Sequence, residues 1–183
     1  MRVQTRGIRE RLALGTACPH QILHEHVDIG KLTSSRLSES EYRQILHFFL
    51  VLYESAEKRR ASADAWPEFT LRSAITALRE DLNLHSASAA EDMPWIKCAE
   101  SSIGMLYVLH GASIGGKFIA KHVTTNLPEM PCHFFGRGIK ADLWQNLVEA
   151  LDSYKGSEEA FECILHSATK TFHCFNRQII SVV

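Results

Sequence analysis

An all-α fold is the first prediction that the sequence supports, because apolar residues recur every three or four positions along most of its 183 residues. Capping and breaking signals (Ser-x-x-Glu, proline and glycine) separate these periodic stretches at the places where helices begin and end. No stretch shows the alternation of apolar and polar residues that is typical of a strand. We therefore expect one all-helical domain over residues 1–183, a length that suits a single hydrophobic core.

Six helices are expected from this pattern, over residues 4–27, 38–60, 67–82, 94–124, 141–154 and 157–179. The first has Gly15 and Pro19 as candidate breaks, because both residues disfavour a helix interior. The second opens with a capping box, in which Ser38 is the N-cap and Glu41 reaches back to it. Pro67 starts the third helix, since proline fits the first turn.

Pro94 is expected to begin the fourth helix, which the Leu127–Pro131 break ends. The segment Phe134–Gly138 is predicted to be a loop. Gly156 ends the fifth helix, and Ser157 caps the last one, whose apolar stripe is rich in phenylalanine.

Composition and charge narrow the classes of function. Hydrophobic residues make up 45% of the chain and charged residues 22%, as in ordinary globular proteins. The net charge of -1 provides no basic field for nucleic acid or an acidic membrane. Apolar runs of about six residues, such as Phe48 to Tyr53, are far short of the roughly 18 that a membrane span needs. The N-terminal residues also lack the apolar core of a signal peptide.

The cysteines indicate a reducing environment. They are odd in number, scattered, and form no Cys-x-x-Cys pair: Cys18, Cys98, Cys132, Cys163 and Cys174. This pattern argues against a disulfide framework and against a thiolate zinc site, and it favours the cytoplasm.

The most informative stretch is the apolar segment Ile103–Phe118, which carries four glycines although each costs about 1 kcal/mol in a helix interior. Gly104, Gly111 and Gly115 share one face of a continuous helix. Such a bare face has two interpretations, which are close packing of another helix and contact with a planar ligand. The Gly115-Gly116 pair is a candidate kink.

Residues Tyr107–Gly116 read Tyr-Val-Leu-His-Gly-Ala-Ser-Ile-Gly-Gly, which resembles the distal-helix motif of bacterial heme oxygenases, especially those associated with bacteriophytochromes. The Phe-Phe-x-x-Gly segment, the tryptophan of the following helix and the phenylalanine-rich last helix occur in the same order as in that family. The resemblance covers nearly the whole chain. It implies a single heme oxygenase-like helical bundle over residues 1–183.

The first helix resembles the proximal helix of the same family, because Leu12, Thr16, His20 and Leu23 match its pattern. The resemblance implies that His20 is the ligand of the heme iron. It assigns further contacts and catalytic roles around the heme. The expected catalytic residues are Gly111, Ser113 and Gly115, and the expected heme-binding residues are His20, Tyr107, Gly111, Gly115, Gly116, Arg137 and Arg177, the two arginines serving the propionates.

What the family resemblance implies for function is oxygen-dependent cleavage of heme to biliverdin, carbon monoxide and ferrous iron. Heme would be both substrate and cofactor. The implied partners are an external electron donor, a ferredoxin or a reductase, and a phytochrome that accepts the biliverdin.

Three other interpretations stay open. A non-catalytic heme-binding or heme-sensing protein on the same fold is favoured by His24, His110 and Ala112, which differ from the family pattern. His20 and His24, one helical turn apart, could form part of a zinc site with His26 as a poor third ligand. A helical bundle without heme would use the glycine face for packing. A di-iron carboxylate site is disfavoured, because the chain has no Glu-x-x-His.

Overall fold

Helices make up the secondary structure of the residues that the computed structural model describes, which are 7–25, 27–85, 92–137 and 141–178, and these ranges contain no β-strand. The prediction of an all-α fold is therefore confirmed. In chain order the elements are α1 (Ile8–Gly15), α2 (Ala17–Glu25), α3 (Val27–Lys31), α4 (Glu39–Ser62), the 3₁₀ turn η1 (Pro67–Phe69), α5 (Arg72–Leu82), α6 (Ala99–Gly111), α7 (Ser113–Asn126), α8 (His133–Arg137), α9 (Ala141–Ser153) and α10 (Glu158–Gln178).

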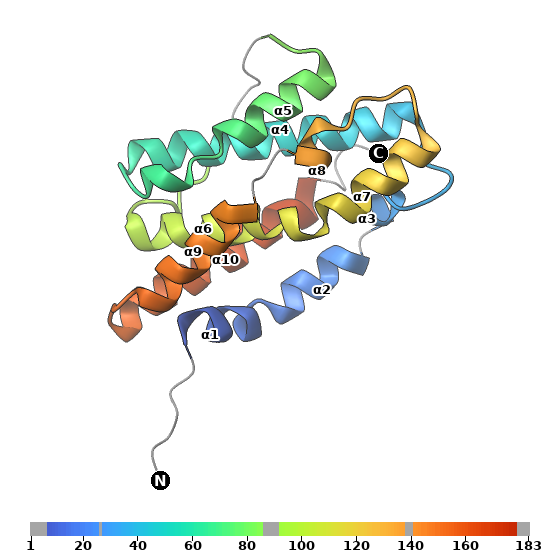
Figure 1. Cartoon of the computed structure of the whole chain (residues 1–183). Coiled ribbons are helices and arrows are strands. Elements are labelled where there is room, and N and C mark those ends of the chain that lie inside the picture. The colour runs from blue at the N-terminus through green and yellow to red at the C-terminus, as the bar shows by residue number, and fades with distance from the viewer. Residues whose placement is uncertain (1–6, 26, 86–91, 138–140, 179–183) are drawn as a thin grey trace.

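The helices are arranged in three layers, with α4 and α5 above, α6 and α10 in the middle, and α1 and α2 below (Figure 1). The two helices of the middle layer, α6 and α10, pack so closely that a Cβ atom at Gly104 would overlap the backbone carbonyl of Ile164 in α10. The Ser167 hydroxyl also donates to the carbonyl of Ser101 at 2.5 Å. Close packing of a helix is thus the role of Gly104.

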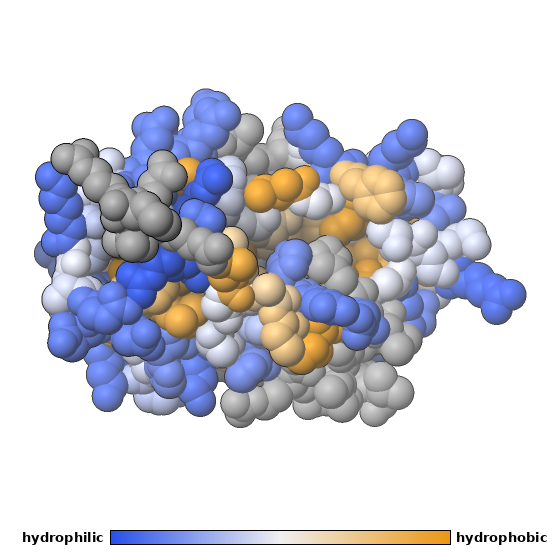
Figure 2. Space-filling model, turned by 90° about the horizontal axis from the view of Figure 1, so that it is seen from below, coloured by the Kyte–Doolittle hydropathy of each residue, from blue (hydrophilic) through white to orange (hydrophobic). Residues whose placement is uncertain are grey.

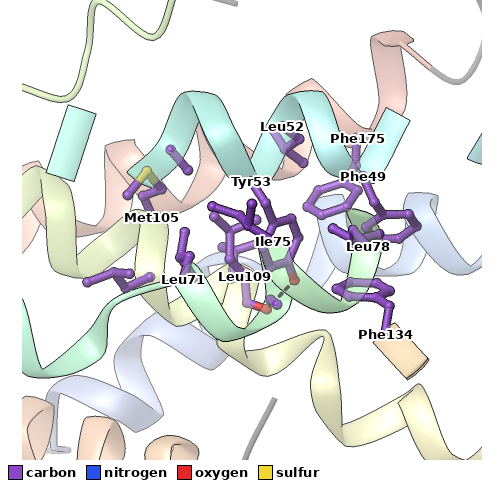
Figure 3. Close-up of a cluster of buried hydrophobic side chains, with 14 of the residues drawn as sticks. Phe49, Leu52, Tyr53, Leu71, Ile75, Leu78, Met105, Leu109, Phe134 and Phe175 are labelled. Carbon is purple, nitrogen blue, oxygen red and sulfur yellow. Dashed lines mark hydrogen bonds between the residues drawn. The ribbon is translucent and has the colours of Figure 1, made fainter. Parts of the chain in front are cut away.

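Aromatic rings join the upper layer to the middle one (Figure 3). The centroid of the Phe49 ring lies 5.2 Å from that of Phe134, 5.7 Å from that of Phe135 and 5.6 Å from that of Phe175. Beside this cluster, the buried Tyr53 hydroxyl donates to the carbonyl oxygen of Leu109 at 2.7 Å.

The capping box at the start of α4 is confirmed. Ser38 accepts a hydrogen bond from the Glu41 backbone, and the Glu41 carboxylate accepts one from the Ser38 backbone at 3.0 Å. These contacts hold the pKa of the Glu41 carboxyl down at about 2. Ser157 likewise caps α10, since its hydroxyl accepts from the backbone of Ala160 at 3.3 Å.

The first predicted helix is divided by a turn at Thr16, next to the expected break at Gly15. The Thr16 hydroxyl donates to the carbonyl of Leu12 at 2.7 Å. Pro19 lies in the first turn of α2 and does not end it, because a backbone N–H there has no partner within the helix to lose.

The glycine-bearing segment departs from the prediction of one helix starting at Pro94. Its first helix, α6, begins at Ala99 and ends at Gly111, and α7 begins after a turn at Ala112. The break falls at Ala112, whose φ of -58° and ψ of -23° stay helical, and the Gly115-Gly116 pair lies within α7. The Tyr53 hydroxyl donates to the carbonyl of Leu109, three residues before this break.

Two other boundaries differ from the predictions. Pro67 opens a short 3₁₀ turn, and α5 begins separately at Arg72. The predicted loop at Phe134–Gly138 is helical over His133–Arg137. The Asp81 carboxylate accepts from the backbone N–H groups of His133 and Phe134 at 2.7 and 2.8 Å, so a residue of α5 caps α8.

The stretch Ala99–Asn126 is long and apolar enough to cross a membrane, by length and composition alone. In the fold it is interrupted at Ala112, and its first half, α6, is the buried central helix. The apolar residues of α6 therefore form part of the protein core.

Candidate functional site

Thr16, at the turn between α1 and α2, lies close enough to Tyr107 of α6 for its hydroxyl to influence the pKa of the Tyr107 phenol. Burial raises the pKa of Tyr107, and the charge of Arg9 and the Thr16 contact partly offset that rise. From this contact, α1–α2 and α6–α7 run in the same direction along the molecule (Figure 1). His20 is one helical turn beyond Thr16, and Gly111 is one turn beyond Tyr107.

His20 is exposed on α2, and its backbone N–H donates to the carbonyl of Thr16 at 3.0 Å. Its imidazole meets the edge of the Phe172 ring of α10, with the ring centroids 5.7 Å apart and the planes at 83°. Leu23, which also matches the pattern of the proximal helix, is half-buried on the same helix. The His20 side chain is therefore oriented by its contact with α10, while His20 remains exposed.

The three glycines of the predicted heme contact have different surroundings. A Cβ atom at Gly111 would lie 3.4 Å from the Trp144 ring of α9, whereas one at Gly115 would meet nothing within 4 Å. At Gly116 it would lie 2.9 Å from the carbonyl oxygen of Phe135 in α8. Gly115 thus exposes its backbone, while Gly116 is buried against α8.

Large apolar side chains are exposed on the helices beside these residues. They are Leu14 of α1 (55%), Ile22 of α2 (46%), Ile114 of α7 (66%) and Phe118 of α7 (62%). Figure 2 shows apolar patches between charged groups on the face nearest α1 and α2. On α7, Ile114 and Phe118 are one turn apart and flank Gly115, so the open backbone lies within an apolar surface.

Other predicted site residues are only partly described. The side chains of Ser113, Arg137 and Arg177 lie outside the described part of the structure, and so do His26 and the His24 side chain. Among the residues that are described, no cluster of three or more His, Cys, Asp or Glu side chains could hold a metal ion. Arg11 of α1 pairs with Glu158 and lies 3.6 Å from the centre of the Phe161 ring.

His110 points into the core, away from Gly115. It is 1% exposed, and its Nε2 atom lies 3.0 Å from the carbonyl oxygen of Phe69. Burial lowers the pKa of this imidazole. His110 therefore links the end of α6 to the turn η1.

Trp144 is a site residue that the sequence did not assign. Its ring covers Gly111 and lies 5.5 Å from the Tyr107 ring, centre to centre. The sequence pattern gives this tryptophan only a place in the order of features along the chain, because its contact with Gly111 brings together helices more than 30 residues apart. A tryptophan on the half-buried face of the amphipathic helix α9 was the available signal.

Comparisons with known proteins place this geometry in a fold family. A structure of heme oxygenase from Leptospira interrogans superposes with a TM-score of 0.73 at 21% identity, covering 97% of this chain and 100% of that one. An NO- and CO-bound heme oxygenase from Neisseria meningitidis gives 0.67 at 20% identity, covering 96% and 91%.

The chain has the heme oxygenase fold. No family model and no curated protein matches the sequence. At this level of identity, the similarity to the two heme oxygenases concerns the arrangement of helices, and the chemistry depends on the residues of this chain.

Proposed function

We propose that the protein is a heme oxygenase that holds heme between α2 and the α6–α7 segment and cleaves it to biliverdin, carbon monoxide and ferrous iron. The observation that carries the proposal is the pairing of an accessible His20 with open glycine backbone. His20 follows Thr16 on α2, and the glycines follow Tyr107 on α6 and α7, so both lie on the same side of the place where Thr16 approaches Tyr107. The heme oxygenase fold supports heme as the ligand.

The residues present fit a heme. An imidazole is a common axial ligand of heme iron, and the exposed ring of His20 has the Phe172 edge to orient it. Gly115 leaves room for a flat ring against the backbone, and the exposed side chains of Ile114 and Phe118 would lose water contact on binding. We assign Gly116 a packing role against α8 in place of the expected heme contact.

Bound heme would supply the oxygen chemistry. The chain would bind the iron through His20 and would limit the space on the other side with Gly111 and Gly115. Their backbone carbonyls can anchor water where a larger side chain would exclude it. Trp144 and Tyr107 form an aromatic wall beside Gly111 that would restrict how the ring is seated. Arg137 and Arg177 remain our candidates for the propionates, and Ser113 for the water network.

Cleavage of heme consumes electrons, so we propose an external donor of the ferredoxin or reductase type. The biliverdin would pass to a phytochrome-type acceptor. We propose a cytoplasmic location, in line with the described cysteines, all five of which carry free thiols.

An absorption titration with hemin tests the proposal. Wild-type protein is expected to give a saturable Soret band near one equivalent of hemin, and His20→Ala is expected to shift or abolish the band because the axial ligand is lost. His47→Ala is the matched control, since His47 is an exposed histidine of α4, in the upper layer of the molecule. No saturable band in the wild type, or equal bands in all three proteins, would contradict the proposal.

Turnover separates the enzyme from a second candidate, a non-catalytic heme-binding or heme-sensing protein. Ala112 favours this second candidate, because the residue after Gly111 carries no polar group to hold water. Adding ascorbate or a ferredoxin system to the hemin complex is expected to give the absorption of biliverdin. A stable ferrous heme spectrum would instead favour the sensing function.

A further inference from the structure

Two cysteines from distant parts of the chain are in contact at the end of α6 opposite Gly111. Cys98 is the N-cap residue of α6 and Cys163 lies in α10. Their sulfur atoms are 3.8 Å apart, the contact distance of two thiols, and both side chains are half-buried, so small solutes reach them. No step of the proposed heme chemistry uses either residue.

The two helices that carry this pair pack closely beside it. Gly104 packs directly against the carbonyl of Ile164, the residue after Cys163, and the Ser167 hydroxyl bonds the Ser101 carbonyl at 2.5 Å. Disulfide sulfurs lie about 2.05 Å apart. Side-chain rotation can bring the two sulfurs to that distance, because they already touch and α6 and α10 are held together by these contacts just beyond the pair.

We propose that Cys98 and Cys163 form a reversible redox site that hydrogen peroxide oxidises to a disulfide. The sulfur of Cys98 attacks the peroxide, so that an S–O bond forms, the O–O bond breaks and water leaves. The sulfur of Cys163 then attacks this sulfenic acid, so that the S–S bond forms and the hydroxyl leaves as a second water. Two thiols and one peroxide give one disulfide and two waters.

Cys98 acts first because its sulfur lies at the N-terminus of α6, where the helix dipole stabilises negative charge. Burial and the contact with Cys98 raise the pKa of Cys163, since negative charge on both touching sulfurs is unfavourable. Glu100 also faces the pair, and its carboxylate accepts a hydrogen bond from the Tyr154 hydroxyl at 2.6 Å. The Ser101 hydroxyl lies 3.4 Å from the Cys98 sulfur, which keeps that sulfur at the helix end.

Peptide mapping of the peroxide-treated, full-length protein tests the site. We expect the protein to lose two hydrogens in mass, to yield a Cys98–Cys163 cross-linked peptide, and to regain its mass with dithiothreitol. The titratable thiols of the denatured protein should fall from the five free cysteines by the two that are joined. This result requires no heme, so it is independent of the proposed function.

Variants define the roles of the two sulfurs. Cys163→Ser is expected to accumulate a sulfenic acid at Cys98 that dimedone traps, Cys98→Ser to leave Cys163 reduced, and the control Cys132→Ser to cross-link like the wild type. Oxidised wild type should melt at a higher temperature than reduced protein, because the link constrains the unfolded chain. A cross-link to another cysteine, over-oxidation of Cys98 without a link, or no reaction while exposed Cys18 is oxidised would overturn the proposal.

Discussion

His110 is a buried imidazole next to the turn that separates α6 from α7. The carbonyl of Phe69 at 3.0 Å is the described partner of its Nε2 atom, and the Glu57 carboxylate is the nearby charge that favours the protonated form. Burial outweighs both and lowers the pKa of His110, so the ring is neutral at pH 7. A neutral ring can donate from Nε2 to the carbonyl without a buried charge.

The pH dependence of stability follows from this shift. Below the ordinary histidine pKa of about 6.5, the unfolded chain binds a proton that buried His110 resists. The free energy of unfolding should therefore fall as the pH drops below that value, by up to about 1.4 kcal/mol per pH unit from this residue. Urea unfolding of wild type and His110→Gln at several pH values measures the difference. Identical slopes for the two proteins would show that His110 is not the group responsible.

At the scale of the helix, Gly104 and Gly115 look alike in the sequence but face different surroundings. Gly104 lies against the α10 backbone, whereas a side chain at Gly115 would point into open space. Neither glycine has a positive φ angle, so alanine fits the backbone conformation at both positions.

Alanine substitution should separate the two glycines. Gly115→Ala is expected to stabilise the heme-free protein by about 0.5–1 kcal/mol, because alanine favours the helix. Gly104→Ala is expected to destabilise it, because the added methyl group overlaps the Ile164 carbonyl. Thermal unfolding measures both effects.

Gly115→Leu should keep the fold yet weaken hemin binding, and unchanged hemin binding in that variant would remove Gly115 from the site.

Local signals predicted those features whose partners are close in sequence. Ser38 and Glu41 form the expected capping box because both members lie in one helical turn. The hydrogen bond of Tyr53 to the end of α6 and the capping of α8 by Asp81 each join residues about 50 positions apart in the chain. Sequence spacing alone could not predict contacts that form only when α4 and α5 pack against later helices.

At the scale of the whole molecule, the ring of Phe49 connects three helices. It is 4% exposed and contacts rings of α4, α8 and α10. The apolar spacing predicted the all-helical architecture and placed Phe49 on the apolar face of α4, and the family resemblance predicted the heme oxygenase fold. For the candidate site, the sequence predicted which residues belong to it but not what they contact. The roles of Trp144 and Gly116 depend on how α9 and α8 pack.

Phe49→Ala should destabilise the protein by about 3–5 kcal/mol, the usual effect of removing a buried aromatic side chain. That loss is a large part of the 5–15 kcal/mol by which most domains are stable. Phe49→Leu, which keeps most of the volume, should cost clearly less. Denaturant unfolding with a constant m-value measures the difference, and equal losses for the two variants would contradict a packing role.

The burial of α6 has a consequence during synthesis. Its apolar surface is covered largely by α10, which the ribosome makes only after α7, α8 and α9. Until α10 emerges, the nascent chain exposes the small-residue face at Gly104 and the stretch Ala99–Asn126, which in length and composition resembles a membrane segment. The contacts that close the fold span more than 60 residues, such as Ser167 to Ser101, so the core around α6 is completed only after α10 has been made.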